Sequence, residues 1–130
     1  MAMTDTVILS LRVDAASNTA GLGYVCLPTG LTGSYKLVSV DRVSNVAITA
    51  SDTDYRTFTV YGVDKTTSQA SRVTTVAGGS TVAGTPESLT VTGGSNAVFT
   101  AGSAIYVGAA EAGTGPACDE TFTFMLEKLR

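Results

Sequence analysis

The chain has 130 residues, which is the size of one domain and enough to bury a single hydrophobic core without metals or disulfides. Charged residues make up only 15% of it, the formal net charge is -3, and a quarter of the residues are Ser or Thr. This balance disfavours nucleic-acid binding, which needs a basic surface, and the Thr-rich composition favours β-structure. Because no signal peptide and no bilayer-spanning apolar run are recognisable, we expect a protein made in the cytoplasm without membrane contact.

The first predicted strand covers residues 6–13, where apolar and polar residues alternate. Ile8 lies on its outer face, and the face expected to be buried holds Val7, Leu9, Leu11 and Val13. Residues 14–23 break the pattern with small polar residues and glycines. Residues 24–27 form a short apolar strand that ends at the turn Pro28-Thr29-Gly30.

The middle of the chain contains three further predicted strands, at residues 34–43, 44–50 and 56–61. The first two are expected to flank a turn near residues 42–45. In the third, Phe58 and Val60 share one face. The carboxylates of Asp52 and Asp54, in the loop before it, are expected to cap backbone N–H groups.

The second half of the chain predicts shorter strands at residues 70–76, 88–92, 97–100, 104–108 and 121–126. The pairs Gly78-Gly79 and Gly93-Gly94 are interpreted as hairpin turns, because neither has the Gly-Lys-Ser/Thr ending of a phosphate-binding loop. The last strand is expected to direct Phe122, Phe124 and Leu126 inward.

These eight to ten short strands predict an all-β, antiparallel β-sandwich of jelly-roll-like architecture, with residues 1–130 forming one domain. A parallel sheet would need crossover helices, and no segment has helical periodicity. Residues 1–5 and 128–130 are interpreted either as arms that order on docking or as frayed ends.

The sequence contains no histidine, so no Ser-His-Asp or Cys-His catalytic arrangement can form. Two clusters of carboxylates are candidates for sugar hydrolysis: Asp52 with Asp54, and Glu111 with Asp119 and Glu120. A sugar site also needs aromatic rings for stacking, and the chain has no Trp and few Phe and Tyr residues. We therefore interpret these carboxylates as turn formers or solvated charges. Asp52-Thr53-Asp54 also lacks the remaining ligands of a calcium loop. We therefore predict no enzymatic activity, no catalytic residues, no cofactor and no metal site.

Cys26 and Cys118 are the only cysteines, and two reduced thiols are expected in a reducing compartment. A bridge between them is the alternative. The four phenylalanines are core candidates. Tyr61 and Tyr106 are interpreted either as outward interface residues or as core tyrosines with bonded hydroxyls.

Several turn motifs resemble those of small structural proteins encoded in the virion gene clusters of tailed phages. They are Thr49-Ala50-Ser51-Asp52-Thr53-Asp54-Tyr55 leading into a strand, Ala101-Gly102, and Gly113-Thr114-Gly115 before the last strand. The similarity covers residues 35–126. Ser103 stands where an Asp often follows the Ala-Gly pair, and Asp54 stands where Asn is common.

The resemblance implies a jelly-roll-like capsid decoration (cement) protein, present on the capsid exterior of the virion as a homotrimer. Its implied partners are other copies of itself and the major capsid protein, and the family brings no catalytic residues. A tail, baseplate or fibre module, including a carbohydrate-binding one, is the alternative.

Overall fold

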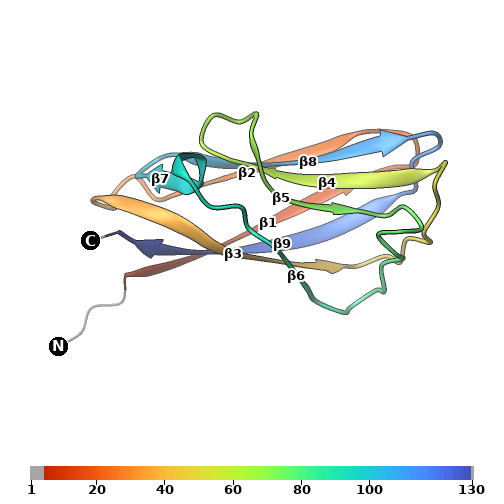
Figure 1. Cartoon of the computed structure of the whole chain (residues 1–130), viewed down its shortest axis with the longest axis horizontal. Helices are drawn as coiled ribbons and strands as arrows, with labels where there is room; N and C mark the ends of the chain where they lie inside the picture. The colour runs from red at the N-terminus through yellow and green to blue at the C-terminus, as the bar shows by residue number, and fades with distance from the viewer. Residues whose placement is uncertain (1–4, 130) are drawn as a thin grey trace.

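The structure, a computed structural model that describes residues 5–129, consists of two antiparallel sheets packed face to face (Figure 1). Sheet A has the order β1-β9-β3-β6, with β7 also paired to β3, and sheet B has the order β2-β8-β4-β5. Sheet A is formed by β1 (Thr6–Ala15), β3 (Ser34–Ser44), β6 (Glu87–Leu89), β7 (Val98–Thr100) and β9 (Cys118–Lys128). Sheet B is formed by β2 (Gly21–Cys26), β4 (Tyr55–Tyr61), β5 (Ser68–Val73) and β8 (Ala104–Ala112). The predicted all-β sandwich is confirmed.

The strands pair from the two ends of the chain inward. β1 pairs with β9 and β2 with β8, so that Thr6 lies opposite Glu127 and Gly21 opposite Ala109. Further in, β3 pairs with β6 and β7, and β4 pairs with β5. Segments far apart in the sequence therefore lie side by side, and each sheet contains strands from both halves of the chain.

The core lies between the sheets and follows the period-two pattern of the strands. Phe58 of β4 and Phe122 of β9 meet across it, with ring centroids 6.1 Å apart. Most inward assignments of the sequence are confirmed, since the following residues are at most 1% exposed: Val13, Phe58, Val60, Phe99, Phe122, Phe124 and Leu126. Val7, Leu9 and Leu11, which share the inner face of β1, are only partly buried against this core. Ile8 is 60% exposed on the outer face of β1, also as predicted.

The turn predicted near residues 42–45 does not exist, because β3 continues through it to Ser44. The polar residues that suggested a turn, Arg42 and Ser44, point into the sandwich and bond to Glu120 of β9. Residues 45–50 are therefore not a strand and make only the isolated bridge between Ile48 and Thr81.

The two glycine pairs are not hairpin turns. Gly78-Gly79 lies between β5 and β6, which belong to different sheets, and Gly93-Gly94 lies between β6 and β7, which both pair with β3. Gly94 instead precedes a single 3₁₀ turn, η1 (Ser95–Ala97). The strand predicted at residues 88–92 is correspondingly short, because the chain leaves sheet A there and the Thr92 amide bonds to the carbonyl oxygen of Gln69 on β5.

The ends of the described chain are held to the sandwich. The Lys128 amide donates to the Asp5 carbonyl oxygen at 2.8 Å, and the Leu129 amide donates to the Ser34 carbonyl oxygen at 2.8 Å. Lys128 and Leu129 thus extend β9 and are not a free arm. The rest of the two predicted arms, residues 1–4 and 130, lies outside the described residues.

Two glycines allow β2 to cross close to β1 at the edge of the sandwich. A Cβ atom on Gly21 would lie 2.8 Å from the carbonyl oxygen of Asp14, and one on Gly23 would lie 3.0 Å from Leu11 Cδ1. The glycines that appeared in the sequence to break the strand pattern are therefore inside a strand, at positions where a side chain would separate the two sheets.

Candidate functional site

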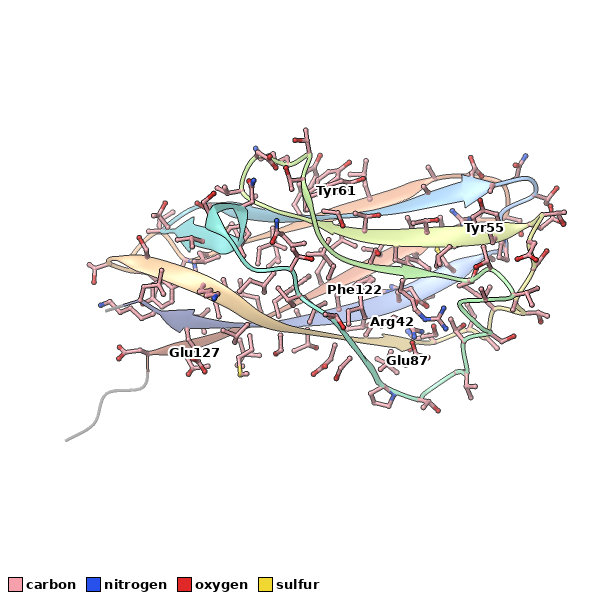
Figure 2. All side chains as sticks on the ribbon, in the orientation of Figure 1. Arg42, Tyr55, Tyr61, Glu87, Phe122 and Glu127 are labelled. Atoms are coloured by element: carbon pink, nitrogen blue, oxygen red, sulfur yellow. The ribbon has the colours of Figure 1, made fainter. Side chains whose placement is uncertain are left out.

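The outer face of sheet B is uncharged along its three most extensively paired strands. The outward-facing residues of β2, β8 and β4 are Leu22, Tyr24, Cys26, Ala104, Tyr106, Gly108, Ala110, Ala112, Tyr55, Thr57, Thr59 and Tyr61. We call this surface the tyrosine face. In Figure 2, Tyr55 and Tyr61 lie at opposite ends of β4 and show how far the face extends along that strand.

Three tyrosines form a row across the tyrosine face. Tyr106 lies opposite Tyr24 on one neighbouring strand and opposite Tyr61 on the other. The ring centroids are 5.1 Å and 5.2 Å apart, with interplanar angles of 58° and 50°. Tilted contacts of this kind are favourable between aromatic rings, so the three side chains hold each other in place. Tyr24 is the most open of the three, at 59% exposed.

A shallow apolar hollow lies beside this row. It has a volume of about 200 Å³ and is lined by Leu22, Thr59, Tyr61, Tyr106, Gly108 and Ala110 among others. Gly108 lies opposite Leu22 on one side and opposite Thr59 on the other, so the missing side chain leaves the floor of the hollow open. The tyrosine face thus combines a raised aromatic row with a small depression.

The outer face of sheet A is different, because it carries charged side chains among hydroxyl and apolar ones. Its charged residues are Arg12, Asp14, Lys36, Asp41, Asp119 and Glu127. Arg12 donates two hydrogen bonds to the Asp119 carboxylate, at 2.7 Å and 2.9 Å. This pairing lowers the pKa of Asp119 below its ordinary value. The two outer faces of the sandwich are therefore chemically distinct.

A polar groove of about 340 Å³ lies between the edge strands β5 and β6. Arg72, its cation, donates to Glu87 at 2.9 Å and to the carbonyl oxygens of Gly79 and Ser80. The hydrogen bond from Arg72 lowers the pKa of Glu87, and the nearby charge of Arg42 adds to the effect. Since the charges of the groove are bonded to each other and to the backbone, the groove presents mainly hydroxyl groups.

The interior of the sandwich contains an ionic cluster at one end. Arg42 donates to Glu120 at 2.7 Å and to Glu87 at 2.6 Å, and Ser44 bonds to both Arg42 and Glu120. Figure 2 shows Arg42 beside Glu87, at the end of the sandwich away from Glu127. The side chains of Arg42 and Glu120 are 0% exposed. The cluster therefore joins strands, and of its charged members only Glu87, which also lines the polar groove, reaches the surface.

The carboxylates weighed for catalysis do not converge. Asp52 accepts a hydrogen bond from the Val76 amide at 2.9 Å and Asp54 accepts one from the Thr114 amide at 2.7 Å, which confirms their role in capping backbone N–H groups. Asp119 and Glu120 point to opposite faces of sheet A, and Glu111 belongs to the other sheet, near the C-terminal end of β8. Within residues 5–129, no group of three or more His, Cys, Asp and Glu side chains could hold a metal ion.

The two cysteines are free thiols, as the sequence predicted. Cys26 is exposed on the tyrosine face, whereas Cys118 is buried at the start of β9. Burial raises the pKa of the Cys118 thiol. The chain therefore carries one accessible thiol on the tyrosine face and one protected thiol in the core.

Sequence reasoning found part of the tyrosine face. Tyr61 and Tyr106 do point outward, which settles the choice between an outward and a core position. It did not identify Leu22 and Tyr24 as outward-facing, although the alternation Leu22-Gly23-Tyr24-Val25-Cys26 carries the signal. The predicted strand begins only at residue 24, because the small polar residues and glycines of residues 14–23 are interpreted as a break in the pattern.

In the part of the chain that the structure covers, no helix is long and apolar enough to cross a membrane. Comparison of the chain with protein-family models, with curated proteins and with solved structures found no match. The resemblance to phage decoration proteins therefore stays a prediction. The tyrosine face is the candidate functional site that the structure itself provides.

Proposed function

We propose that this chain is a non-enzymatic structural protein of a virus particle, which decorates the capsid exterior and stabilises the shell. It would act through self-association and through contacts with the major capsid protein. The tyrosine face carries the proposal, because an uncharged sheet surface with exposed Leu22 and Tyr24 is suited to burial against protein. Tyr is enriched at interfaces and charged residues are depleted from their centres.

The nested strand pairing supports a jelly-roll topology for this protein. In a jelly roll, eight antiparallel strands form two sheets joined by Greek-key connections. Here β1 pairs with β9, β2 with β8, β3 with β6 and β4 with β5, which is the order expected when a long hairpin of strands wraps into two sheets. β7 then adds a second short segment beside β3.

The difference between the two outer faces supports the use of each face for a different contact in the assembly. A decoration protein needs at least two contact surfaces, one for its own copies and one for the shell. The sandwich offers the tyrosine face on sheet B and the charged face on sheet A, which includes the Arg12–Asp119 pair. A homotrimer made in the host cytoplasm and bound to the capsid surface would use both.

The test is to add purified protein to empty capsids of the virus that encodes it and to separate bound from free protein by sedimentation. We expect saturable binding in a fixed ratio to the major capsid protein, and capsids that resist heating better than undecorated ones. An absence of binding at protein concentrations well above those in infected cells would contradict the proposal.

A tail, baseplate or fibre module that binds carbohydrate is the second candidate, and the row Tyr24–Tyr106–Tyr61 with its hollow favours it. Sugar stacking needs an open ring face. The neighbouring rings are inclined to each other by 50° and 58°, so part of the row presents ring edges, which makes it a less suitable stacking surface. Binding on a glycan array that disappears in a Tyr24→Ala variant would favour this candidate over the decoration role.

A further inference from the structure

We infer that the tyrosine face is the surface through which copies of this chain contact each other, with Leu22 and Tyr24 as its most exposed apolar side chains. This inference rests on the self-association in the proposed function, which assigns it to no surface, and not on the homotrimer, because a face that contacts the same face of its copy joins two chains about a twofold axis. The occupant we propose is a second copy of the chain. A capsid protein seated on the same face would be a different result and is distinguished below.

Charge favours a second copy on this face. The chain has a net charge of -3, so an excess of acidic residues on a contacting surface adds repulsion between two copies, and an uncharged surface adds none. The outer face of sheet A carries the bases Arg12 and Lys36 against four acids, Asp14, Asp41, Asp119 and Glu127. Contact between two such acidic faces would be unfavourable, whereas the tyrosine face presents no charge to its copy.

One of the two most exposed apolar side chains of the tyrosine face, Tyr24, is already ordered before contact. Leu22 is 55% exposed and Tyr24 is 59% exposed, and both lie on β2, the edge strand of sheet B. Tyr24 is held against Tyr106, which is in turn held against Tyr61. Burying side chains that are fixed in advance costs little conformational entropy, so more of the apolar burial appears as affinity.

The size of the face indicates a weak contact. With strands about 4.8 Å apart and a rise of about 3.3 Å per residue, the three strands of the tyrosine face span roughly 350 Å² per copy. Two copies would bury about 700 Å², which is smaller than a standard specific interface and in the range of transient ones. We therefore expect association that depends on concentration, and not an obligate oligomer.

Cys26 supplies a built-in reporter for this contact. Its thiol lies on the tyrosine face two residues from Tyr24, whereas Cys118, at 3% exposed, serves as an internal control. The experiment is a brief pulse of iodoacetamide at increasing protein concentration, with alkylation counted by intact mass. At a total concentration about ten times the dissociation constant, we expect alkylation of Cys26 to slow about fivefold while Cys118 stays unmodified throughout.

A matched pair of variants locates the surface. Leu22→Glu places a charge on the tyrosine face, and Ile8→Glu places the same charge on the outer face of sheet A at a residue that is 60% exposed. Leu22 and Ile8 both lie on edge strands, β2 and β1. In sedimentation equilibrium we expect Leu22→Glu to be monomeric with unprotected Cys26, and Ile8→Glu to match the unmodified protein. Equal urea midpoints would show that both variants fold.

The outcomes separate this inference from the proposed function. If Ile8→Glu dissociates the protein and Leu22→Glu does not, copies meet through sheet A and the inference is overturned while the decoration role stands. If the protein is monomeric at every concentration and Cys26 is protected only on capsids, the face binds the shell and the inference is again overturned. Self-association that Leu22→Glu abolishes supports the inference, even if capsid binding fails and the proposed function falls.

Discussion

Arg42 of β3 and Glu120 of β9 form an ion pair inside the sandwich, with Arg42 Nε 2.7 Å from Glu120 Oε1 and both side chains 0% exposed. Ser44 bonds to both partners, and Glu87 accepts a further hydrogen bond from Arg42. The cost of removing these charges from water is offset by this set of partners. Removing one partner leaves the other charge buried without that compensation and destabilises the fold.

We expect Arg42→Met to lower the free energy of unfolding by about 3–5 kcal/mol, because the buried Glu120 then has no cationic partner. Glu120→Leu should cost less, because Arg42 keeps its ion pair with Glu87. The double variant should lose much less than the sum of the two, since it removes both charges together. Urea unfolding of the four proteins measures this. A double variant whose loss equals that sum would show that the two side chains act independently.

Glu87 makes the stability of the protein sensitive to acid. The hydrogen bond from Arg72 lowers its pKa in the folded state below the ordinary value of 4.5. A carboxylate of this kind stabilises the fold above its unfolded pKa, and the stabilisation is lost as pH falls through the folded pKa. We therefore expect the urea midpoint to be constant near neutral pH and to fall between about pH 5 and 2.

The variant Glu87→Gln tests the origin of that fall. It should be less stable than the unmodified protein at neutral pH, and the difference should shrink as the pH drops. Glu111→Gln removes a carboxylate from an exposed position at the end of β8 and serves as the control. A difference between Glu87→Gln and the unmodified protein that stays constant down to the lowest pH would rule out Glu87 as the acid-sensitive group.

The period-two pattern predicted most of the fold, because burial on one face of a strand leaves a direct record in the sequence. The pattern succeeded best at β1, β4 and β9, where every inner position is apolar except those of Arg56 and Glu120. It failed at the end of β3, where Arg42 and Ser44 are buried polar residues that only their distant partner Glu120 explains.

The candidate site was less predictable than the fold for a related reason. The tyrosine row joins three strands, and register between Tyr24, Tyr106 and Tyr61 is set by pairings that no local pattern contains. The glycines of β2 added to the difficulty. Gly21 and Gly23 leave room for β1, which lies close to β2 in the folded protein. Nothing in the residues around the two glycines indicates that contact, because only the fold brings β1 and β2 together.

Gly21 and Gly23 should differ in their tolerance of a side chain. A Cβ on Gly21 would lie 2.8 Å from a backbone oxygen, that of Asp14, which can move only with β1. A Cβ on Gly23 would lie 3.0 Å from a methyl group of Leu11, which can rotate away. We expect Gly21→Ala to lower the free energy of unfolding by about 1–3 kcal/mol and Gly23→Ala by less. Urea unfolding gives the comparison, and the reverse order would mean that β1 moves more easily than Leu11.

Arg56 of β4 connects three segments of the chain through backbone carbonyl oxygens. Its buried guanidinium donates to Pro116 at 2.7 Å, to Ala16 at 2.8 Å and to Thr19. Ala16 and Thr19 lie in the connection between β1 and β2, and Pro116 lies between β8 and β9. The planar fork of five N–H donors suits this arrangement, and an ammonium group could not reach all three oxygens from one point.

We therefore expect Arg56→Lys to lower the free energy of unfolding by about 1–3 kcal/mol, because partly buried carbonyl groups lose their donors. The effect should be largest where the two connections meet, at the Asn18 amide, which donates to the Gly115 carbonyl oxygen at 2.7 Å. Hydrogen exchange followed by NMR should show the Asn18 amide exchanging faster by more than the global loss of stability explains. Arg12→Lys, at an exposed arginine of sheet A, is the matched control and should leave Asn18 unchanged. If every slowly exchanging amide of Arg56→Lys exchanges faster by the same factor, the prediction is wrong. Arg56 would then stabilise the whole sandwich and not these two connections in particular.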